Sequence, residues 1–196
     1  MKLHLYITLI VLLFRFIPCL SQSLLNYDDR LLIKWTNEYK LHWKDFIYSN
    51  DKPVLNRHYS EAISATNIVA FHRLDNSDIE FKIYATFDSD NSFTSDTSKI
   101  SLLLHEQLHF DITEFHARLL RKAIDSIKAQ RTISLEDFYF QLDSIHQCNT
   151  SMQILYDEQT AHGMINSAQE IWLRTIRNSL EKLSDFEYLV EESYNQ

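Results

Sequence analysis

Residues 104–127 read LHEQLHFDITEFHARLLRKAIDSI, and this stretch determines how the second half of the chain folds. Apolar residues recur in it every three or four positions, which is the period of one face of an α-helix. The stretch Asp96–Ser98 ahead of it offers side chains that cap helix N-termini. These recurring residues form one apolar stripe, which comprises Leu104, Leu108, Ile112, Phe115, Leu119, Ala123 and Ile127. More apolar residues lie on either side of this stripe, so we expect a long helix that is buried nearly all round.

The residues before position 95 follow a different period. In Ile79–Phe87, apolar and more polar side chains alternate, which is typical of a β-strand with one buried face. Residues 30–36 and 62–73 are shorter runs rich in residues that favour strands. Polar stretches at 75–78 and 88–92 separate these runs as loops. The N-terminal half therefore predicts a small, mainly antiparallel sheet.

More helices are expected after the long one. Ser134, with Asp137 three residues later, is a weak form of the capping-box pattern and predicts a helix start. This helix continues, or restarts near Thr150, up to His162, where Gly163 is a natural stop. A further helix is predicted to begin within 166–169. Strands first and helices afterwards, packed on one face of the sheet, indicate an α+β fold with three or more helices.

Composition limits the function. The chain has 196 residues, enough for one domain, and a formal net charge of −8, which excludes a basic surface for nucleic acids. It has two cysteines, too few for a Cys-rich metal cluster or a disulfide framework. Any metal must therefore be held by imidazole and carboxylate groups, and the chain carries nine His and 27 Asp and Glu.

Residues 1–21 predict a cleaved signal peptide. Lys2 precedes an almost wholly apolar run over 3–14, and Cys19 and Ser21 place small side chains where a signal peptidase acts. Arg15 makes this run too short for a membrane-spanning helix, so a retained anchor is the weaker interpretation. We expect an exported protein, periplasmic or secreted, with a single domain over 22–196 and no stable membrane insertion. Cleavage of the signal peptide would remove Cys19, and the thiol of the other cysteine, Cys148, is expected to be buried.

The clearest chemical motif is His105-Glu106-Gln107-Leu108-His109. Two histidines four residues apart lie on the same helix face and can bind one Zn²⁺, and the glutamate between them can act as a general base for peptide hydrolysis. The alternative is a solvated helix face that carries these residues by accident. Burying two His and a Glu without a partner is unfavourable, so the apolar surroundings favour a metal site.

A zinc site needs a third protein ligand. Glu114 lies about 140° around the helix from His109, and a salt bridge with Arg118 suits it better. His116 lacks the glycine that would turn the chain back to the metal, and we interpret it as a surface or supporting residue. Three candidates remain in the segment 156–163, in decreasing order of preference: His162, Asp157 and Glu158.

Several elements together resemble a bacterial domain-of-unknown-function family described as predicted secreted zinc-dependent proteases. The resemblance runs from about residue 28 to residue 175, with the elements in the same order. It implies a zincin-like, metalloprotease-like fold and peptidase activity, and it favours His162 as the third ligand. The matching residues are Leu41, Trp43, Asp45-Phe46, Phe87, Ser92, Leu103–Glu114, Ala117-Arg118, Tyr156-Asp157, Thr160, His162-Gly163, Gln169 and Trp172.

The leading hypothesis is thus an exported zinc metallopeptidase that acts on peptides or proteins, with His105, His109 and His162 as ligands and Glu106 as the base. One alternative is a non-catalytic exported domain in which the metal is structural, and another is a metal-free packing module. Tyr156 is either a helix-face aromatic or a hydrogen-bond donor to the reacting group. The edge of the strand 79–87 is a place where an extended peptide could add.

Overall fold

The computed structural model describes residues 32–49, 54–55, 58–59, 61–75 and 78–188. The expected signal peptide, residues 1–21, lies outside this range. The helices are α1 (Ile100–Lys128), α2 (Leu135–Thr160) and α3 (Asn166–Lys182), with 3₁₀ turns at Trp43–Asp45, Ser89–Asn91 and Ser184–Phe186. The strands are β1 (Leu32–Lys34), β2 (Ile47–Tyr48), β3 (Val54–Leu55), β4 (His58–Tyr59), β5 (Ala62–Ile63), β6 (Thr66–Asp75), β7 (Asp78–Asp88) and β8 (Phe93–Thr94).

The strands form small sheets that are mostly antiparallel. The largest has the order β1-β7-β6, and its hairpin β6–β7 is paired from Thr66 opposite Phe87 to Asp75 opposite Asp78. A second sheet has the order β2-β8-β5, in which β2 and β8 run parallel, and β3 pairs with β4. The predicted α+β class, with sheets in the N-terminal half and helices after them, is confirmed.

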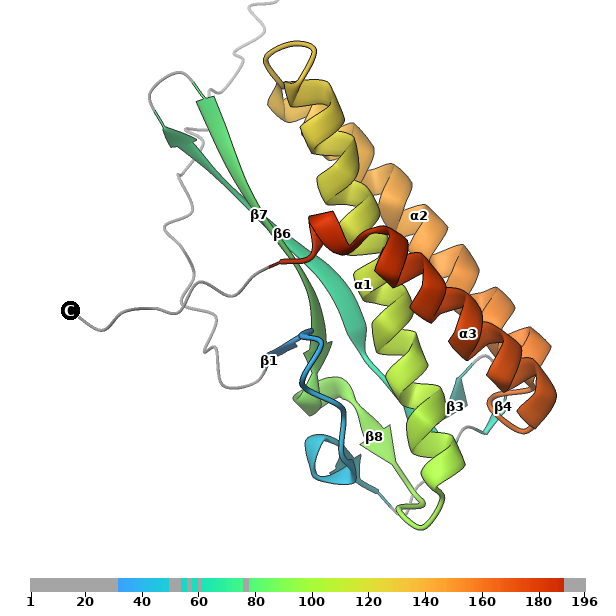
Figure 1. Ribbon diagram of the computed structural model, residues 1–196. Coiled ribbons are helices and arrows are strands. Elements are labelled where there is room, and N and C mark those ends of the chain that lie inside the picture. The colour runs from blue at the N-terminus through green and yellow to red at the C-terminus, as the bar shows by residue number, and fades with distance from the viewer. Residues whose placement is uncertain (1–31, 50–53, 56–57, 60, 76–77, 189–196) are drawn as a thin grey trace, which may run out of the picture.

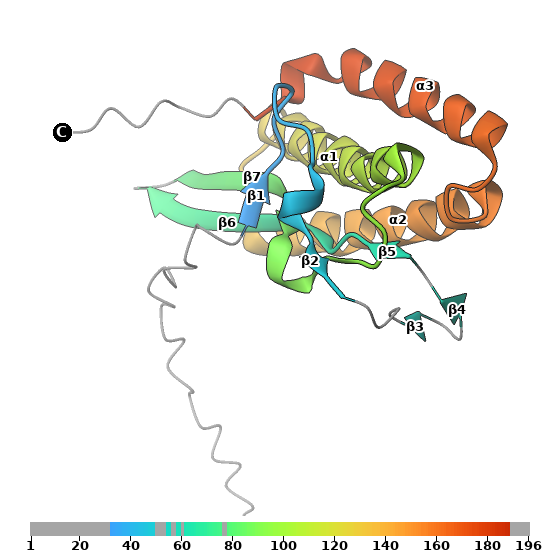
Figure 2. The ribbon, with the colours of Figure 1, turned by 90° about the horizontal axis from the view of Figure 1, so that it is seen from below.

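The helix α1 lies at the centre of the molecule. In Figures 1 and 2 the hairpin β6–β7 covers one side of α1, while α2 and α3 lie along other sides of it. Polar residues of α1 such as His105, Glu106 and Glu114 are therefore buried together with its apolar ones. The expectation of a helix that is buried nearly all round is confirmed, although Leu104 is exposed.

Two apolar clusters hold these layers together. The larger lies between the sheet, α1 and α2, and includes Trp35, Phe46 and Phe87, with Trp43 packed against it. The smaller joins the three helices through Leu108, Ile112, Tyr156 and Ile176. Burying aromatic and aliphatic side chains on both sides of α1 fixes the position of this helix relative to the sheet and to its neighbours.

The helix boundaries follow the sequence signals in part. Ser134 accepts a hydrogen bond from the Asp137 backbone and Asp137 accepts one from that of Ser134, so the predicted capping box is confirmed. α1 begins later than expected, with Lys99 as its N-cap. The Asp96 carboxylate instead accepts hydrogen bonds from the backbone and hydroxyl of Ser98. Cys148 is exposed, so the expectation of a buried thiol is wrong.

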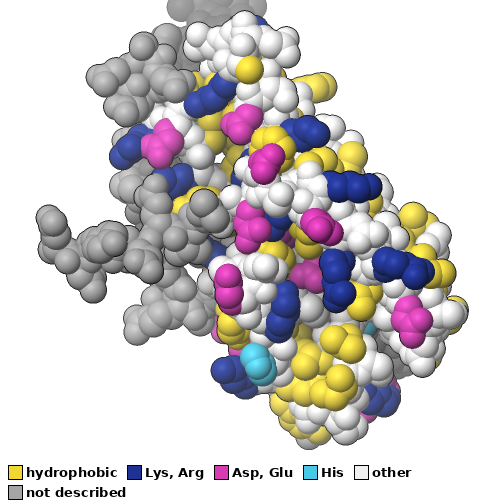
Figure 3. All heavy atoms as spheres, in the orientation of Figure 1, with side chains coloured by type: hydrophobic (Ala, Val, Ile, Leu, Met, Phe, Trp, Pro, Cys, Tyr) yellow, Lys and Arg dark blue, Asp and Glu magenta, His cyan; other side chains and the backbone are white. Residues whose placement is uncertain are grey.

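Charged side chains are mixed over the face shown in Figure 3, where acidic and basic groups alternate without forming a large patch of one sign. Hydrophobic side chains gather at the lower end of this face, the end at which α1 begins. Ile100 and Leu104, in the first turns of α1, are exposed. Within the described residues, no helix is both long and apolar enough to span a bilayer.

Candidate metal centre

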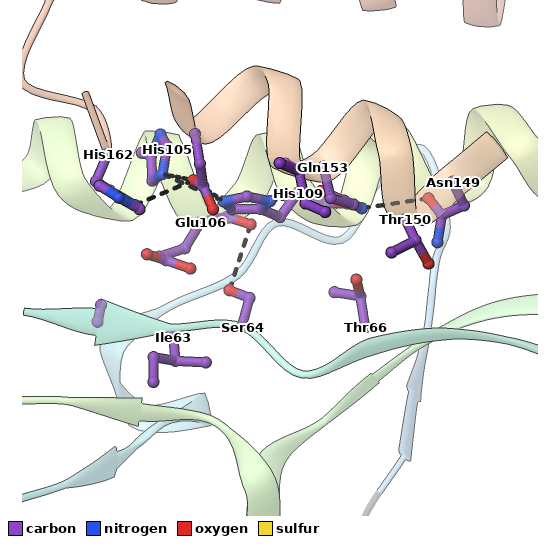
Figure 4. A pocket seen from close by; sticks show the side chains of 13 residues that line it. Ile63, Ser64, Thr66, His105, Glu106, His109, Asn149, Thr150, Gln153 and His162 are labelled. Carbon is purple, nitrogen blue, oxygen red and sulfur yellow. Dashed lines mark hydrogen bonds and ion pairs between the residues drawn. The ribbon is translucent and has the colours of Figure 1, made fainter. Parts of the chain in front are cut away.

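Side chains from α1 and α2 converge on one point. The Nε2 atoms of His105 and His109 lie 3.2 Å apart, and Oδ1 of Asp157 lies 3.1 Å from the first and 3.0 Å from the second. Figure 4 shows His105 and His109 on the side of α1 that faces α2. The sequence predicted the pair of histidines, and the structure adds Asp157 to them.

Antiparallel packing of two helices produces this convergence. His105 and His109 are one turn apart on α1, as Gln153 and Asp157 are on α2, so each pair projects from a single face. The two faces meet so that His105 lies opposite Asp157 and His109 lies opposite Gln153. The apolar contacts of Tyr156 with Leu108 and Ile112 keep the helices in this register.

The three groups have the chemistry and spacing of a metal site. Two imidazole nitrogens and a carboxylate oxygen are a common donor set for Zn²⁺, whose bonds of about 2.0–2.1 Å place tetrahedral ligand atoms about 3.3 Å apart. The distances of 3.0–3.2 Å between the three atoms are close to this spacing. The group formed by His105, His109 and Asp157 could therefore hold a metal ion.

The same contacts shift the ionisation of the site. Burial disfavours the charged form of His109, but the hydrogen bond to Asp157 and the negative charges of Glu106 and Asp157 outweigh it, and the pKa of His109 is raised. Burial alone would raise the pKa of Asp157, yet its hydrogen bonds to His105 and His109 hold this pKa well below its ordinary value. The site thus favours a positive charge between a carboxylate and two imidazoles.

His162 lies at the side of this group. Its Nδ1 is 3.4 Å from Oδ1 of Asp157, and its side chain is half exposed. The group of mutually close ligand atoms contains Asp157 and leaves His162 out. Glu158, the third candidate, is exposed. The structure therefore places both preferred candidates near the histidines, with Asp157 in direct contact and His162 beside it.

A left-handed turn positions His162. α2 ends at Thr160, and Ala161, His162 and Gly163 have φ angles of 48°, 54° and 80°. A Cβ atom at residue 163 would lie 2.9 Å from Cγ of His105 and 3.2 Å from its Nδ1, so only glycine fits there. The helix thus ends at Thr160, two residues before the expected end at His162, and Ala161 is its C-cap. Gly163 lets the chain that follows pass close to the His105 ring.

A cavity of about 310 Å³ opens beside the three groups. Figure 4 shows Ser64 and Thr66 facing Glu106 and His109 across it. No residue of β7 lines this cavity, and among the described residues β1 pairs with β7 only over Thr86–Asp88, so peptide addition along the edge of 79–87 stays a prediction and is not part of this cavity. The lining residues are Ala62, Ile63, Ser64, Thr66, His105, Glu106, His109, Asn149, Thr150, Gln153, Ile154, Asp157 and His162.

The carboxylate of Glu106 can contact a molecule in this cavity. Its side chain is buried and lines the cavity wall. Within the part of the chain that the structure describes, its carboxylate has neither a hydrogen bond nor an ion pair, and its backbone carbonyl accepts a weak hydrogen bond from Ser64. A carboxylate on the cavity wall that has no described partner and lies next to two imidazoles can accept a proton from a molecule in the cavity.

Three further residues contact the histidines: Gln153, which the sequence analysis missed, and Gln169 and Tyr156, which it did not assign to this role. Oε1 of Gln169 lies 3.2 Å from Nδ1 of His105, and Oε1 of Gln153 lies 2.5 Å from Nδ1 of His109. Tyr156 stacks on the His105 ring and donates its hydroxyl hydrogen to Oε1 of Gln169. Tyr156 is wholly buried and does not line the cavity, so packing describes its place better than a contact with a reacting group.

The other candidates on α1 lie away from this centre. Glu114 is buried and pairs with Arg118 at 2.9 Å and with Arg121 at 3.0 Å, so the expected salt bridge is confirmed. His116 is buried, not at the surface, and its Nδ1 lies 2.9 Å from the carbonyl oxygen of Ile112. Neither residue belongs to the metal-binding group.

Comparisons with known proteins add no assignment: no family model, no curated protein and no solved structure matches this chain.

Proposed function

We propose that this protein is an exported, zinc-dependent peptidase whose metal is held by His105, His109 and Asp157. The observation that supports this most is the close approach of their three ligand atoms, within 3.0–3.2 Å of one another, at the wall of a cavity. The resemblance to predicted secreted zinc-dependent proteases, and the signal-peptide pattern over residues 1–21, support the same proposal.

Zinc suits the donor set better than the common alternatives. Imidazole ligands disfavour Mg²⁺ and Ca²⁺, which prefer oxygen atoms only. A catalytic zinc has three protein ligands and one open position, and there the ion supplies a Lewis acid and a water molecule of lowered pKa. His105, His109 and Asp157 would provide the three ligands, and all three line the cavity that a water molecule or a substrate would enter.

Glu106 is the general base in this proposal. Its carboxylate lines the cavity next to the histidines and has no described partner that would compete for a proton. It takes a proton from water as the peptide carbonyl is attacked, and it passes this proton to the leaving amine. The cavity, about 310 Å³ in volume, is large enough for one side chain of a peptide and the scissile bond.

Whether His162 is a metal ligand decides between a catalytic and a structural metal site. If His162 bound the ion together with the other three groups, the site would have four protein ligands and no open position, as in structural zinc sites. The contact of His162 with Asp157, 3.4 Å long, instead suits a residue that orients the carboxylate or meets the substrate at the cavity rim.

Two measurements on the mature chain test this function. Wild type, Glu106→Gln and the exposed control Glu158→Gln are purified, their zinc content is determined, and each is incubated with unfolded casein whose fragments are counted by mass spectrometry. We expect about one zinc per chain in all three, cleavage by wild type and by Glu158→Gln, and none by Glu106→Gln. Equal cleavage by Glu106→Gln would overturn the assigned base. Bound zinc without any cleavage would favour a structural metal.

A further inference from the structure

We infer that Gln153 and Gln169 are positioning residues that fix the hydrogen on Nδ1 of each histidine and so direct both Nε2 atoms to the metal. This inference rests on the proposed metal site. The relevant contacts are those of the two Gln Oε1 atoms with Nδ1 of His109 and His105. An amide oxygen can only accept a hydrogen bond, so each Nδ1 must donate.

The orientation of the Gln153 amide follows from its other contacts. Its Nε2 lies 2.9 Å from the carbonyl oxygen of His109, 3.1 Å from Oγ1 of Thr113 and 3.3 Å from Oδ1 of Asn149. The hydroxyl of Thr113 already donates to the carbonyl oxygen of His109. All three neighbours therefore present acceptors, which requires the amide nitrogen on that side and leaves Oε1 facing Nδ1 of His109.

Gln169 contacts Tyr156 as well as His105. The Tyr156 hydroxyl lies 2.7 Å from Oε1 of Gln169 and 3.3 Å from the carbonyl oxygen of His105. Its single hydrogen goes to the nearer oxygen, so Oε1 of Gln169 accepts from both Tyr156 and His105. Tyr156 and Gly163 also pack on the His105 ring, so its angle is restricted.

The two hydrogen bonds at Nδ1 determine the state of Nε2 in His105 and His109. With a hydrogen on each Nδ1, a neutral imidazole has its lone pair on Nε2, and both lone pairs point toward the oxygen of Asp157. Three acceptors within 3.0–3.2 Å of one another repel unless a cation lies among them. The glutamines therefore prepare the site for a cation, either a metal ion or a proton.

An amide in this position differs from a carboxylate. Metal-binding histidines often donate to a carboxylate, which makes the imidazole a stronger donor to the metal, and removing such a partner weakens metal binding about 10- to 100-fold. A neutral amide fixes the tautomer without adding a negative charge to a site that already contains Asp157 and Glu106. We expect glutamate in place of either glutamine to retain or strengthen zinc binding, and leucine to weaken it.

The test uses Gln169→Leu, Gln153→Leu and Gln169→Glu, with Gln159→Leu as the matched control. Gln159, like Gln153, is an amide on α2, and it accepts a hydrogen bond from Trp172 on α3; among the described residues it has no hydrogen bond to His105 or His109. Zinc affinity is measured by competition with a chromophoric chelator. We expect the Kd to rise about 10- to 100-fold in both leucine variants and to stay at or below the wild-type value in Gln169→Glu and Gln159→Leu.

A second readout does not depend on zinc. Long-range ¹H–¹⁵N spectra of the metal-free protein report whether Nδ1 of each histidine carries a hydrogen protected from exchange with water. We expect this signal on both rings in wild type, its loss only at His105 in Gln169→Leu, and its loss only at His109 in Gln153→Leu. A bare Nδ1 in wild type, or equal Kd values for Gln169→Leu and Gln159→Leu, would overturn the inference. A wild type that binds no zinc but keeps both protected hydrogens would contradict the proposed function alone.

Discussion

Oδ1 of Asp157 lies 3.0 Å from Nε2 of His109, although 48 residues separate them in the chain. This contact joins α2 to α1 at the cavity wall and makes Asp157 the third member of the group that could hold a metal ion. Asp157→Asn retains the shape of the side chain but removes its charge. We expect the Kd for zinc to rise by more than about 100-fold, since loss of a direct ligand exceeds the loss of an outer contact.

His162→Ala and Glu158→Gln are compared with Asp157→Asn, and the Kd for zinc of all three variants is measured by competition with a chelator. We expect less than about a tenfold change for His162→Ala, which removes a neighbour of Asp157, and no change for the exposed Glu158. A larger effect of His162→Ala than of Asp157→Asn would show that the imidazole is the third ligand, as the family resemblance implies.

Gly163→Ala should destabilise the protein. The added Cβ would meet Cγ of His105 at 2.9 Å, and the φ angle of 80° disfavours any side chain. We expect a loss of about 1–3 kcal/mol in the free energy of urea unfolding, together with weaker zinc binding because the His105 ring is displaced. Ala161→Gly, at a φ of 48° in the same turn, should leave stability unchanged or raise it by up to about 1 kcal/mol. Equal losses in the two variants would contradict this account of the turn.

The ion cluster around Glu114 should be important for stability. Glu114 and Arg118 are both buried, and Arg121 also pairs with this carboxylate. Glu114→Ala leaves two guanidinium groups without this partner, so we expect unfolding to become about 3–5 kcal/mol easier. Glu80→Ala breaks the exposed pair with Arg73 and should change stability by less than about 1 kcal/mol. A small effect of Glu114→Ala, measured in the same urea titrations, would count against a structural role for the cluster.

His116 should make the metal-free protein sensitive to acid. Burial lowers the pKa of its imidazole, so the folded state binds its proton less readily than the unfolded state does. The stability that this neutral ring contributes is fully present above its ordinary pKa of about 6.5 and is lost as the pH falls through the lowered value. His116→Asn can still donate to the carbonyl oxygen of Ile112 and should unfold with a flatter pH profile between about pH 5 and pH 7. Parallel profiles for wild type and variant, in the presence of chelator, would contradict this prediction.

Local patterns in the sequence predicted most of the fold. The alternation over 79–87 became the central strand β7, and the pair Ser134 and Asp137 caps α2 as expected. These signals depend on a few neighbouring residues, so they can be identified without knowledge of the tertiary structure. The pairing of β1 with β7, and the position of α2 and α3 on α1, depend on contacts between distant residues, which no local pattern contains.

The metal centre shows the same limit. The spacing of His105 and His109 predicted that they lie on one face of a helix. Which residue of the segment 156–163 lies opposite that face depended on where α2 ends. Because α2 stops at Thr160 and the next residues turn left-handed, His162 leaves the helix face that Asp157 keeps. The i,i+4 spacing of Gln153 and Asp157 matches that of the two histidines, and this match was the signal that could have pointed to both residues.

An anomalous difference map at the zinc absorption edge, from crystals of the mature chain grown without chelator, tests the central claim most directly. We predict one strong peak about 2.0–2.2 Å from Nε2 of His105, Nε2 of His109 and a carboxylate oxygen of Asp157. A map without a peak between these side chains, from protein shown to be folded and supplied with zinc, would contradict it.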